Sequence, residues 1–308
     1  MPCPSCSAPV FAGDLFCEAC GHRLSPAARP AAETVHHREI DLGDDAAAVS
    51  DRGLRHSTNQ DGMALSPIPG GLAAVLSDGV SASPRPEEAS GTAVETGISV
   101  LTRELEAGAD PRDATRTAAL AAAKAVAGLA ADPSSAPACT YVSAVTGELD
   151  GRPVITIGWI GDSRAYWIGA TGDELLTEDD SWAEHVIAHG MMSREEAYAD
   201  RRAHMLVGWM GADAREIDVH VRVYAPEVPG VLVVCTDGLW NYMASPLALA
   251  AALADPLADP VSGPLTGRRG RRTPLSVARE LVRTALSGGG HDNITVAIIP
   301  VEGDGLEL

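Results

Sequence analysis

Short runs of valine, leucine and isoleucine recur along the chain, and each is bounded by turn-forming residues. Their length and β-branched content favour buried strands over helices. The runs are residues 72–76, 139–145, 154–160, 231–235 and 294–299. Helices are predicted between them in alanine-rich or amphipathic stretches at 87–107, 113–130, 180–189, 194–201, 246–254 and 274–286. Two long helices among the early strands, followed by strands with short connections, predict a layered α/β (α+β) sandwich with helices covering sheets.

The charge of the chain is strongly negative. Its 308 residues include 23 basic and 42 acidic side chains, which give a formal net charge of −19. Nucleic-acid binding and docking on anionic lipid both depend on clustered lysine and arginine, so neither partner is expected. The apolar content of 45% suffices for a sizeable core. No run of about 18 apolar residues predicts membrane insertion, and cysteines stand where a signal peptide would need a basic start and an apolar stretch, so we expect a cytoplasmic protein.

Basic residues gather at only one place in the acidic part of the chain, at 268–272. A single five-residue island flanked by glycine and proline is typical of a solvated loop. Recruitment of an acidic partner and autoinhibition are the alternatives. The charge balance excludes a zinc-ribbon transcription factor.

The N-terminal segment differs in composition from the rest. Residues 1–38 carry three acidic and three basic side chains, so the whole negative excess lies in residues 39–308. Two compositions in one chain indicate two units. We expect a zinc ribbon at 1–24, a flexible Ala/Pro-rich linker at 25–38, a large domain at 39–302 and a tail at 303–308.

Four cysteines form two CxxC pairs in this head, Cys3 with Cys6 and Cys17 with Cys20. Two such turns complete a tetrahedral sulfur site for a structural Zn²⁺ ion. Two disulfides or redox-active pairs are the alternatives, but no thioredoxin-like context surrounds the cysteines. The segment resembles the short zinc-ribbon modules of bacterial signalling proteins. Because it has no net charge, it is expected to dock to a protein partner or to serve as a local structural cap.

Aspartates lie at the ends of the predicted strands of the large domain. Asp78 and Asp237 each follow a strand and precede glycine, Asp162 follows another strand, and Asp292 comes just before the last one. Each motif alone is a common turn signal. If these strand ends meet at one rim, however, the carboxylates converge and require cations between them. Oxygen ligands of this kind select Mg²⁺ or Mn²⁺.

Six motifs in a fixed order carry a resemblance to a known family. They are Ser50-Asp-Arg-Gly-Leu with Asn59-Gln-Asp, Leu76-Ser-Asp-Gly, Gly161-Asp-Ser-Arg-Ala-Tyr, Leu176-Thr with Asp180-Ser, Cys235-Thr-Asp-Gly-Leu-Trp-Asn and Gly289-Gly-His-Asp-Asn-Ile-Thr-Val. Together they resemble the metal-dependent, type 2C protein Ser/Thr phosphatases, bacterial type, over roughly residues 39–301. The resemblance implies two antiparallel β-sheets packed together, flanked by helices, with a two-metal centre at one edge.

The resemblance also implies roles for individual residues. Asp78 would bridge both metal ions, and the carbonyl of Gly79 would bind one of them. Asp237 and Asp292 would complete the shell of the other ion. Asp61 would be a carboxylate behind these ligands.

Further roles follow from the same resemblance. Asp162 would help to hold a third Mg²⁺ or Mn²⁺ ion, and Asn293 would support the site by hydrogen bonding. Residues 176–215 would form a flap over the substrate. Trp182, His204 and Trp209 belong to this flap.

Two positions depart from the family pattern. Gln60 stands where the family usually has a glutamate that binds the second metal, and it keeps an oxygen but loses a charge. His56 stands where the family usually has an arginine that grips phosphate. Arg55 or Arg85 could supply a displaced guanidinium, and His56 itself could hold phosphate or act as a general acid. An inert loop histidine is the alternative for His56.

The resemblance predicts a protein serine/threonine phosphatase that hydrolyses phosphoserine and phosphothreonine with a metal-activated water. It would act on phosphorylated proteins and oppose bacterial Ser/Thr kinases. Asp78, Asp237, His56 and Arg55 are the candidate catalytic residues. The alternative is a pseudophosphatase that binds phosphorylated partners without turnover, and Gln60 and His56 are the features that favour it.

Overall fold

The computed structural model describes residues 36–132, 135–214, 216–254 and 272–301. They belong to the unit His36–Leu308, which is separate from Met1–Val35. The predicted zinc ribbon lies outside the described residues, as do the tail at 303–308 and residues 268–271 of the basic island.

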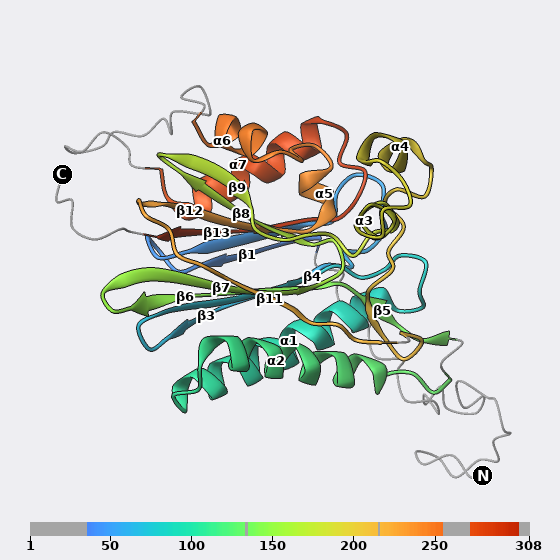
Figure 1. Ribbon diagram of the computed structural model, residues 1–308, viewed down its shortest axis with the longest axis horizontal. Helices are drawn as coiled ribbons and strands as arrows, with labels where there is room; N and C mark the ends of the chain where they lie inside the picture. Colours follow the sequence, from blue (N-terminus) through green and yellow to red (C-terminus); the bar gives the residue numbers. More distant parts are fainter. Residues whose placement is uncertain (1–35, 133–134, 215, 255–271, 302–308) are drawn as a thin grey trace, which may run out of the picture. The chain divides into compact units, whose positions relative to one another are not determined.

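Two antiparallel β-sheets pack face to face and form the centre of the unit (Figure 1). The first sheet has the order β1-β2-β13-β12-β8-β9. Its strands are β1 (His37–Asp41), β2 (Ala47–Asp51), β13 (Ile294–Val301), β12 (Gly230–Cys235), β8 (Arg164–Gly169) and β9 (Gly172–Leu175). The second has the order β11-β7-β6-β4-β3. Its strands are β11 (His220–Tyr224), β7 (Arg152–Ile160), β6 (Tyr141–Leu149), β4 (Gly71–Ser77) and β3 (Gly62–Ile68). The predicted layered sandwich of two antiparallel sheets is confirmed.

Helices cover the outer face of each sheet (Figure 1). On the five-stranded sheet lie α1 (Pro86–Glu106) and α2 (Pro111–Ala127). On the six-stranded sheet lie α5 (Asp237–Trp240), α6 (Pro246–Ala254) and α7 (Pro274–Ser287). Two short helices, α3 (Trp182–Ala188) and α4 (Arg194–Ala199), pack on each other at one end of the sandwich. A short ladder joins β5 (Ala138–Cys139) to β10 (Met210–Gly211).

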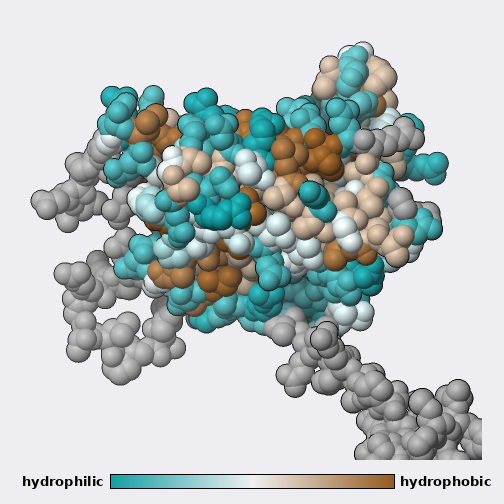
Figure 2. Space-filling model, turned by 90° about the horizontal axis from the view of Figure 1, so that it is seen from below, coloured by the Kyte–Doolittle hydropathy of each residue, from teal (hydrophilic) through white to brown (hydrophobic). Residues whose placement is uncertain are grey.

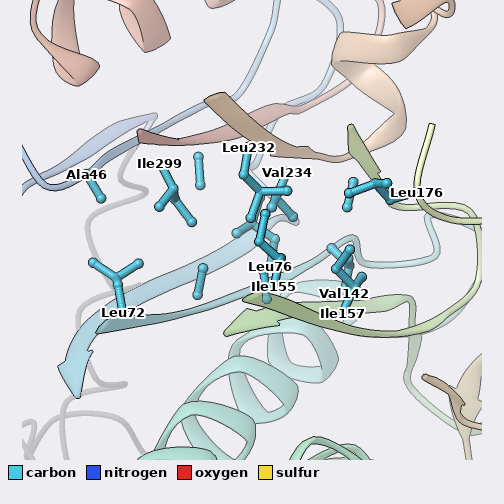
Figure 3. Packing of buried hydrophobic residues seen from close by; sticks show 14 of the residues in the cluster. Ala46, Leu72, Leu76, Val142, Ile155, Ile157, Leu176, Leu232, Val234 and Ile299 are labelled. Carbon is cyan, nitrogen blue, oxygen red and sulfur yellow. The ribbon is translucent and has the colours of Figure 1, made fainter. Parts of the chain in front are cut away.

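Three hydrophobic clusters fill the spaces between these layers. Strand β4 contributes side chains to two of them, which explains why its sequence is a continuous apolar run. Leu72 and Leu76 point into the core between the two sheets (Figure 3). Ala73 and Val75 point the other way, into the cluster beneath α1 and α2. Because successive side chains of a strand alternate between faces, a strand buried on both faces must be apolar throughout. The remaining cluster lies between the six-stranded sheet and α5, α6 and α7.

Alanine spacing positions the long helices against the sheet. Ala114, Ala118 and Ala122 of α2 recur every fourth residue and are fully or almost fully buried. Their small side chains allow the helix to lie close to the strands. The helix begins where Asp110 accepts a hydrogen bond from the backbone N–H of Arg112 at 2.8 Å, followed by proline at the first helical position.

Several edge and polar strands were missed by the sequence pattern. The Ser50-Asp-Arg-Gly motif begins inside a strand that was not predicted, because Ser50 and Asp51 are the last residues of β2. They are held in the sheet by β1 on one side and by β13 on the other. Strand β1 begins at His37, inside the predicted linker 25–38. Strands β3, β8, β9 and β11 were likewise not predicted.

The outer surface mixes hydrophilic and hydrophobic patches when it is seen from the side of α1 and α2 (Figure 2). Among the described residues, no helix has both the length and the apolar content that crossing a membrane requires.

Candidate metal and phosphate site

Five aspartates from distant parts of the sequence meet at one edge of the sandwich. We call Asp61, Asp78, Asp162, Asp237 and Asp292 the aspartate rim. In an antiparallel pair the end of one strand lies beside the start of its partner. Gly62 therefore faces Ser77, which brings the residue before β3 next to the residue after β4. Cys235 faces both Val296 and Arg164, which brings together the ends of β12, β13 and β8.

The carboxylates of the aspartate rim act on one another. Burial raises the pKa of Asp78 well above its ordinary value, and the charges of Asp61, Asp237, Asp162 and Asp292 raise it further. Burial also raises the pKa of Asp237 to about 6, with Asp292 the next cause. A group of buried carboxylates with these shifts is unfavourable when ionised unless positive charge lies between them.

Asp61 lies deepest in the aspartate rim. One of its carboxylate oxygens, Oδ2, accepts hydrogen bonds from the hydroxyls of Thr236 at 2.9 Å and Thr295 at 2.7 Å. Burial raises its pKa to about 7, although these two hydrogen bonds act in the opposite direction. Asp61 directly precedes β3 of the five-stranded sheet. Its carboxylate is thus held by threonines at β12 and β13 of the six-stranded sheet.

Two buried oxygens of the aspartate rim lack partners. Oδ1 of Asp61 and Oδ1 of Asp237 are shielded from solvent, and neither has a hydrogen-bond partner among the described residues. Such orphaned carboxylate oxygens are costly in a protein interior. An all-oxygen donor set suits a hard divalent cation such as Mg²⁺ or Mn²⁺. The residues present therefore fit the metals that the sequence predicts.

The aspartate rim is not a ready-made ligand shell. Within the described part of the chain, no three histidine, cysteine, aspartate or glutamate side chains are grouped closely enough to hold a metal ion. Mg²⁺ ordinarily keeps several water ligands and takes only one or two carboxylates from a protein, so a complete cage is not required. The individual metal roles of Asp78, Asp162, Asp237 and Asp292 stay predictions.

Gly79 lies where only glycine fits. A Cβ atom at this position would come within 2.6 Å of the carbonyl oxygen of Pro86 and 2.7 Å of that of Gln60. The backbone N–H of Gly79 donates to the same Gln60 oxygen at 3.2 Å. The turn after Asp78 is thereby held against the segment that precedes β3.

Gln60 is held in place by hydrogen bonds of both its backbone and its side chain. Its N–H donates to Oδ1 of Asn293 at 2.7 Å, and its side-chain Oε1 accepts from the hydroxyl of Ser81 at 2.6 Å. Asn293 also donates from Nδ2 to the carbonyls of Arg52 at 2.7 Å and Thr58 at 3.1 Å. Asn293 therefore ties three parts of one loop to the start of β13.

The predicted phosphate-binding residues occupy different places. His56 lies at the aspartate rim, with Nε2 3.2 Å from Oδ1 of Asp292. Arg55 pairs its guanidinium with Nε2 of His291 at 2.8 Å, beside Asp292. Arg85 instead donates to Glu88 at 2.6 Å and to the carbonyl of Leu129 at 3.1 Å. Its guanidinium is therefore engaged near the start of α1, and Arg55 is the guanidinium closer to the rim.

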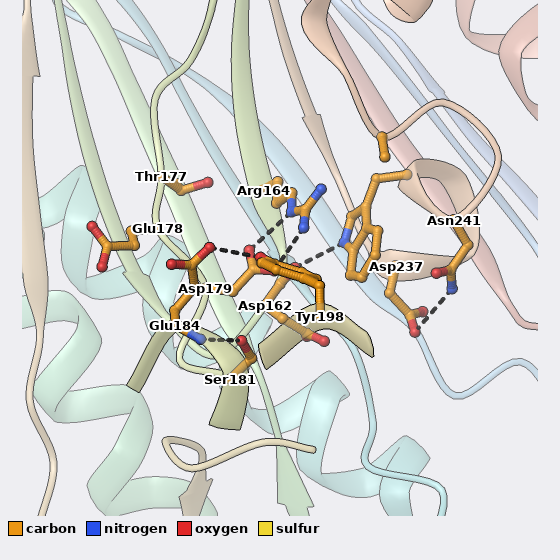
Figure 4. Close-up of polar contacts among 12 residues, drawn as sticks. Asp162, Arg164, Thr177, Glu178, Asp179, Ser181, Glu184, Tyr198, Asp237 and Asn241 are labelled. Carbon is orange, nitrogen blue, oxygen red and sulfur yellow. Dashed lines mark hydrogen bonds and ion pairs between the residues drawn. The ribbon is translucent and has the colours of Figure 1, made fainter. Parts of the chain in front are cut away.

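A buried ion pair lies behind the aspartate rim, and sequence reasoning gave it no role (Figure 4). Arg164 donates from Nε and Nη2 to the two oxygens of Asp179 at 2.9 and 2.7 Å. Its guanidinium stacks on the ring of Trp240, 3.8 Å from the centroid. The Gly-Asp-Ser-Arg and Asp-Gly-Leu-Trp motifs contain Arg164 and Trp240, but nothing in the sequence showed that these two residues touch each other or Asp179.

The predicted flap, residues 176–215, is described up to residue 214, and this part borders two hollows. One, of about 820 Å³, lies among β7–β9, α3 and α4, with Arg164, Asp179, Arg194 and Tyr198 in its walls. The other, of about 480 Å³, lies between residues 80–84, which follow the Asp78-Gly79 turn, and residues 204–213. None of the five rim aspartates lines either hollow.

Comparisons with known proteins agree with this architecture. A sequence model described as protein phosphatase 2C matches residues 53–265. The curated protein named serine/threonine phosphatase stp of Listeria innocua is 28% identical over 145 residues, 47% of this chain and 51% of that protein. A Listeria monocytogenes protein of the same name is 27% identical over a segment of the same length. The match thus spans about half the length of these curated relatives.

Solved structures show the same fold over nearly all of their length. The PPM Ser-Thr phosphatase MsPP from Mycobacterium smegmatis, in complex with cacodylate, has a TM-score of 0.62 at 27% identity and covers 82% of this chain and 97% of its own. Serine/threonine phosphatase Stp1 from Staphylococcus aureus has a TM-score of 0.67 at 22% identity and covers 86% and 99%. At the lower identity the likeness concerns the fold alone.

Proposed function

The chain belongs to the protein phosphatase 2C family, and on this basis we propose that it is a metal-dependent protein serine/threonine phosphatase. Its substrates would be phosphoserine and phosphothreonine in cytoplasmic proteins, so that it opposes Ser/Thr kinases. The observation that carries the proposal is the aspartate rim, where carboxylates of like charge leave two buried oxygens without partners among the described residues. A rim of this kind suits divalent cations, which in turn suit a phosphorylated substrate.

The chain's own residues would divide the work as follows. Asp78 would hold both of two Mn²⁺ or Mg²⁺ ions. The carbonyl of Gly79 would bind one of these ions, Asp237 and Asp292 would complete the ligands of the other, and Asp162 would help to hold a third ion. When bound, the metals supply an acidified water as the nucleophile and positive charge toward the phosphoryl oxygens. Asp61 would fix the rim from behind through its two threonine hydroxyls.

His56 and Arg55 would serve the phosphate itself. His56 lies 3.2 Å from Asp292, where it could donate a proton to the leaving oxygen of serine or threonine. Arg55 would hold a phosphoryl oxygen after leaving His291, its present partner. Residues 204–213 of the flap would border the phosphopeptide.

A Mn²⁺ titration tests the proposal. Full-length protein would be offered a phosphothreonine peptide, beside Asp78→Ala and Asp237→Ala. We expect turnover that depends on Mn²⁺ in the unaltered protein and none in either variant. Absence of turnover at millimolar Mn²⁺ would contradict an enzymatic role.

A pseudophosphatase is the second candidate, and one contact favours it. Oε1 of Gln60, the oxygen that stands in for the family's glutamate, already accepts a hydrogen bond from Ser81. If Gln60 cannot serve a metal, the protein would bind phosphorylated partners without releasing phosphate. Binding of the phosphothreonine peptide by calorimetry, with no phosphate released, would identify this case.

We also propose that Cys3, Cys6, Cys17 and Cys20 hold a structural Zn²⁺ ion and that this head docks the phosphatase to a protein of a kinase pathway. The CxxC spacing and the neutral charge of the head support the proposal. Full-length protein should contain one zinc per chain, and Cys3→Ser with Cys17→Ser should contain none. Equal zinc in both proteins would rule out the cysteine site.

A further inference from the structure

The guanidinium of Arg164 is fully engaged inside the protein and is not free for phosphate. The side chains of Arg164 and Asp179 are buried, and two hydrogen bonds join them. A third donor of Arg164, Nη1, reaches the hydroxyl of Tyr166 at 3.1 Å. Because Trp240 covers the face of this guanidinium, the role of Arg164 has to be sought in what it holds in place.

Trp240 connects this ion pair to the aspartate rim. Its indole N–H donates to the backbone carbonyl of Asp162 at 2.8 Å. Trp240 is buried and belongs to α5, the helix that begins at Asp237. One aromatic ring therefore contacts Arg164 on its face and the backbone of Asp162 at its edge, between two aspartates of the rim.

The base of the flap holds the neighbouring peptide. The carboxylate of Asp180 accepts from the N–H of Gly161 at 2.8 Å, and the N–H of Asp180 donates to the carbonyl of Gly161 at 3.0 Å. Gly161 has φ of 101°, which glycine adopts without strain. Asp179 and Asp180 thus hold Arg164 and Gly161 from consecutive positions of the flap.

We propose that Trp240 and Arg164 are positioning residues for Asp162. Through them the turn that carries Asp162 is held to α5 and to the ion pair of Arg164 with Asp179. The inference rests on the proposed function to the extent that Asp162 holds a metal ion. In metal sites, partners that orient a ligand are ordinarily worth about 10- to 100-fold in metal affinity.

Two matched tryptophan variants test the assignment. Trp240→Phe keeps an aromatic ring beside Arg164 and removes the N–H that reaches Asp162, together with part of the indole volume. Trp159→Phe removes an equivalent N–H, which donates at 2.7 Å to the carbonyl of Glu178 at the flap base and not to the rim. Both tryptophans are buried, so the two variants share the cost of losing one indole hydrogen bond.

The readout is Mn²⁺ binding to metal-stripped full-length protein by calorimetry, with thermal unfolding in EDTA as the check on folding. We expect Trp240→Phe to weaken the Asp162-dependent Mn²⁺ site about 10-fold and Trp159→Phe to leave it within about 2-fold. In an Asp162→Ala background, Trp240→Phe should have no further effect, because the ligand that it orients is gone.

The outcomes separate this inference from the proposed function. Equal Mn²⁺ affinity in the two tryptophan variants, or an undiminished effect of Trp240→Phe without Asp162, overturns the positioning role alone. An unaltered protein that binds no Mn²⁺ overturns both. Binding with the expected pattern but without turnover of p-nitrophenyl phosphate supports the positioning role and contradicts the phosphatase.

Discussion

Asp162 and Arg164 are near neighbours in sequence and both are buried, yet their charges are compensated in different ways. Arg164 has an opposite charge within the chain, and Asp179 meets it with two hydrogen bonds. Burial alone would lower the pKa of Arg164, but Asp179 raises it. The pKa of Asp162 is raised by burial and then by Asp237 and Asp179, and Arg164 only partly opposes this.

The contrast separates a buried charge that is compensated within the protein from one that is not. A buried ion pair whose donors and acceptors are satisfied needs nothing from solution. Carboxylates that face one another, with oxygens left unpaired among the described residues, are unfavourable when ionised and are relieved by a proton or by a bound cation. The charge of the aspartate rim therefore responds to protons and cations from solution, whereas the pair of Arg164 and Asp179 is satisfied within the fold.

Removal of one rim charge gives the largest expected effect. Asp237→Asn should weaken Mn²⁺ binding by more than about 100-fold, because it removes a ligand charge. It should also raise the stability of the metal-free protein, on the order of 1 kcal/mol, because a carboxylate whose pKa is raised destabilises the fold when it is ionised. Thermal unfolding with and without Mn²⁺ measures both effects.

The control for this variant is Asp44→Asn, which changes the net charge equally at an exposed loop position. It should leave Mn²⁺ binding and stability nearly unchanged. A metal-free Asp237→Asn protein that is less stable than the unaltered one would show that the rim charges are compensated within the chain.

Loss of the buried ion pair is expected to affect stability strongly at any metal concentration. Asp179→Asn leaves Arg164 buried with one acceptor lost and should cost about 3 kcal/mol, or roughly 10 °C in melting temperature. The matched control is Glu39→Gln, which breaks a doubly hydrogen-bonded pair with Arg279 at 2.8 and 2.7 Å on the surface. That exposed pair should be worth less than about 1 kcal/mol. Denaturant unfolding measures the loss of stability in both variants. Equal losses would contradict the expectation that the buried ion pair contributes more stability than the exposed one.

Addition of a charge to the rim should act in the opposite direction to its removal. Gln60→Glu should lower the Mn²⁺ concentration for half-maximal turnover of p-nitrophenyl phosphate by about 10-fold, since a charged oxygen replaces a neutral one. Ser81→Ala, which frees Oε1 of Gln60, is the companion variant. If Gln60→Glu leaves the Mn²⁺ titration unchanged, Gln60 is not a metal ligand.

The smallest expected effect is the pH dependence of stability that His220 contributes through its contact with Asp180. A hydrogen bond to Asp180 raises the pKa of His220 above 6.5, and the charges of Asp180, Asp218 and Glu178 act in the same direction. A raised histidine pKa means that the stabilisation is complete below pH 6.5 and is lost as pH rises through the folded-state pKa. Because His220 is partly exposed, the effect should stay below about 1 kcal/mol.

His220→Asn should remove this pH dependence of the unfolding free energy, whereas His185→Asn, on the exposed side of α3, should retain it. Denaturant unfolding between pH 6 and 9 measures the slope. Identical slopes in the unaltered protein and in His220→Asn would contradict a pairing of His220 with Asp180 in solution.

Strand and helix positions were predictable where burial leaves a regular signal in the sequence. The run in β4 is buried on both faces, the alanines of α2 recur every fourth residue on its buried face, and both elements lie where the sequence placed them. Strand β1 is mostly exposed and carries charged residues, and the alanine-rich β2 ends in Ser50 and Asp51. Such strands are defined by their neighbours in the sheet, so a local pattern does not reveal them.

The sequence by itself determined which residues could form the site, because aspartates beside glycine at strand ends are local features. It also left Gln60 and His56 as the two departures from the family pattern. Only the tertiary structure decided that two threonine hydroxyls hold Asp61, that Arg85 is engaged at α1, and that Trp240 joins Arg164 to Asp162. The physical reason is that strand pairing and side-chain packing join residues distant in sequence, and the charge on a buried group depends on those neighbours.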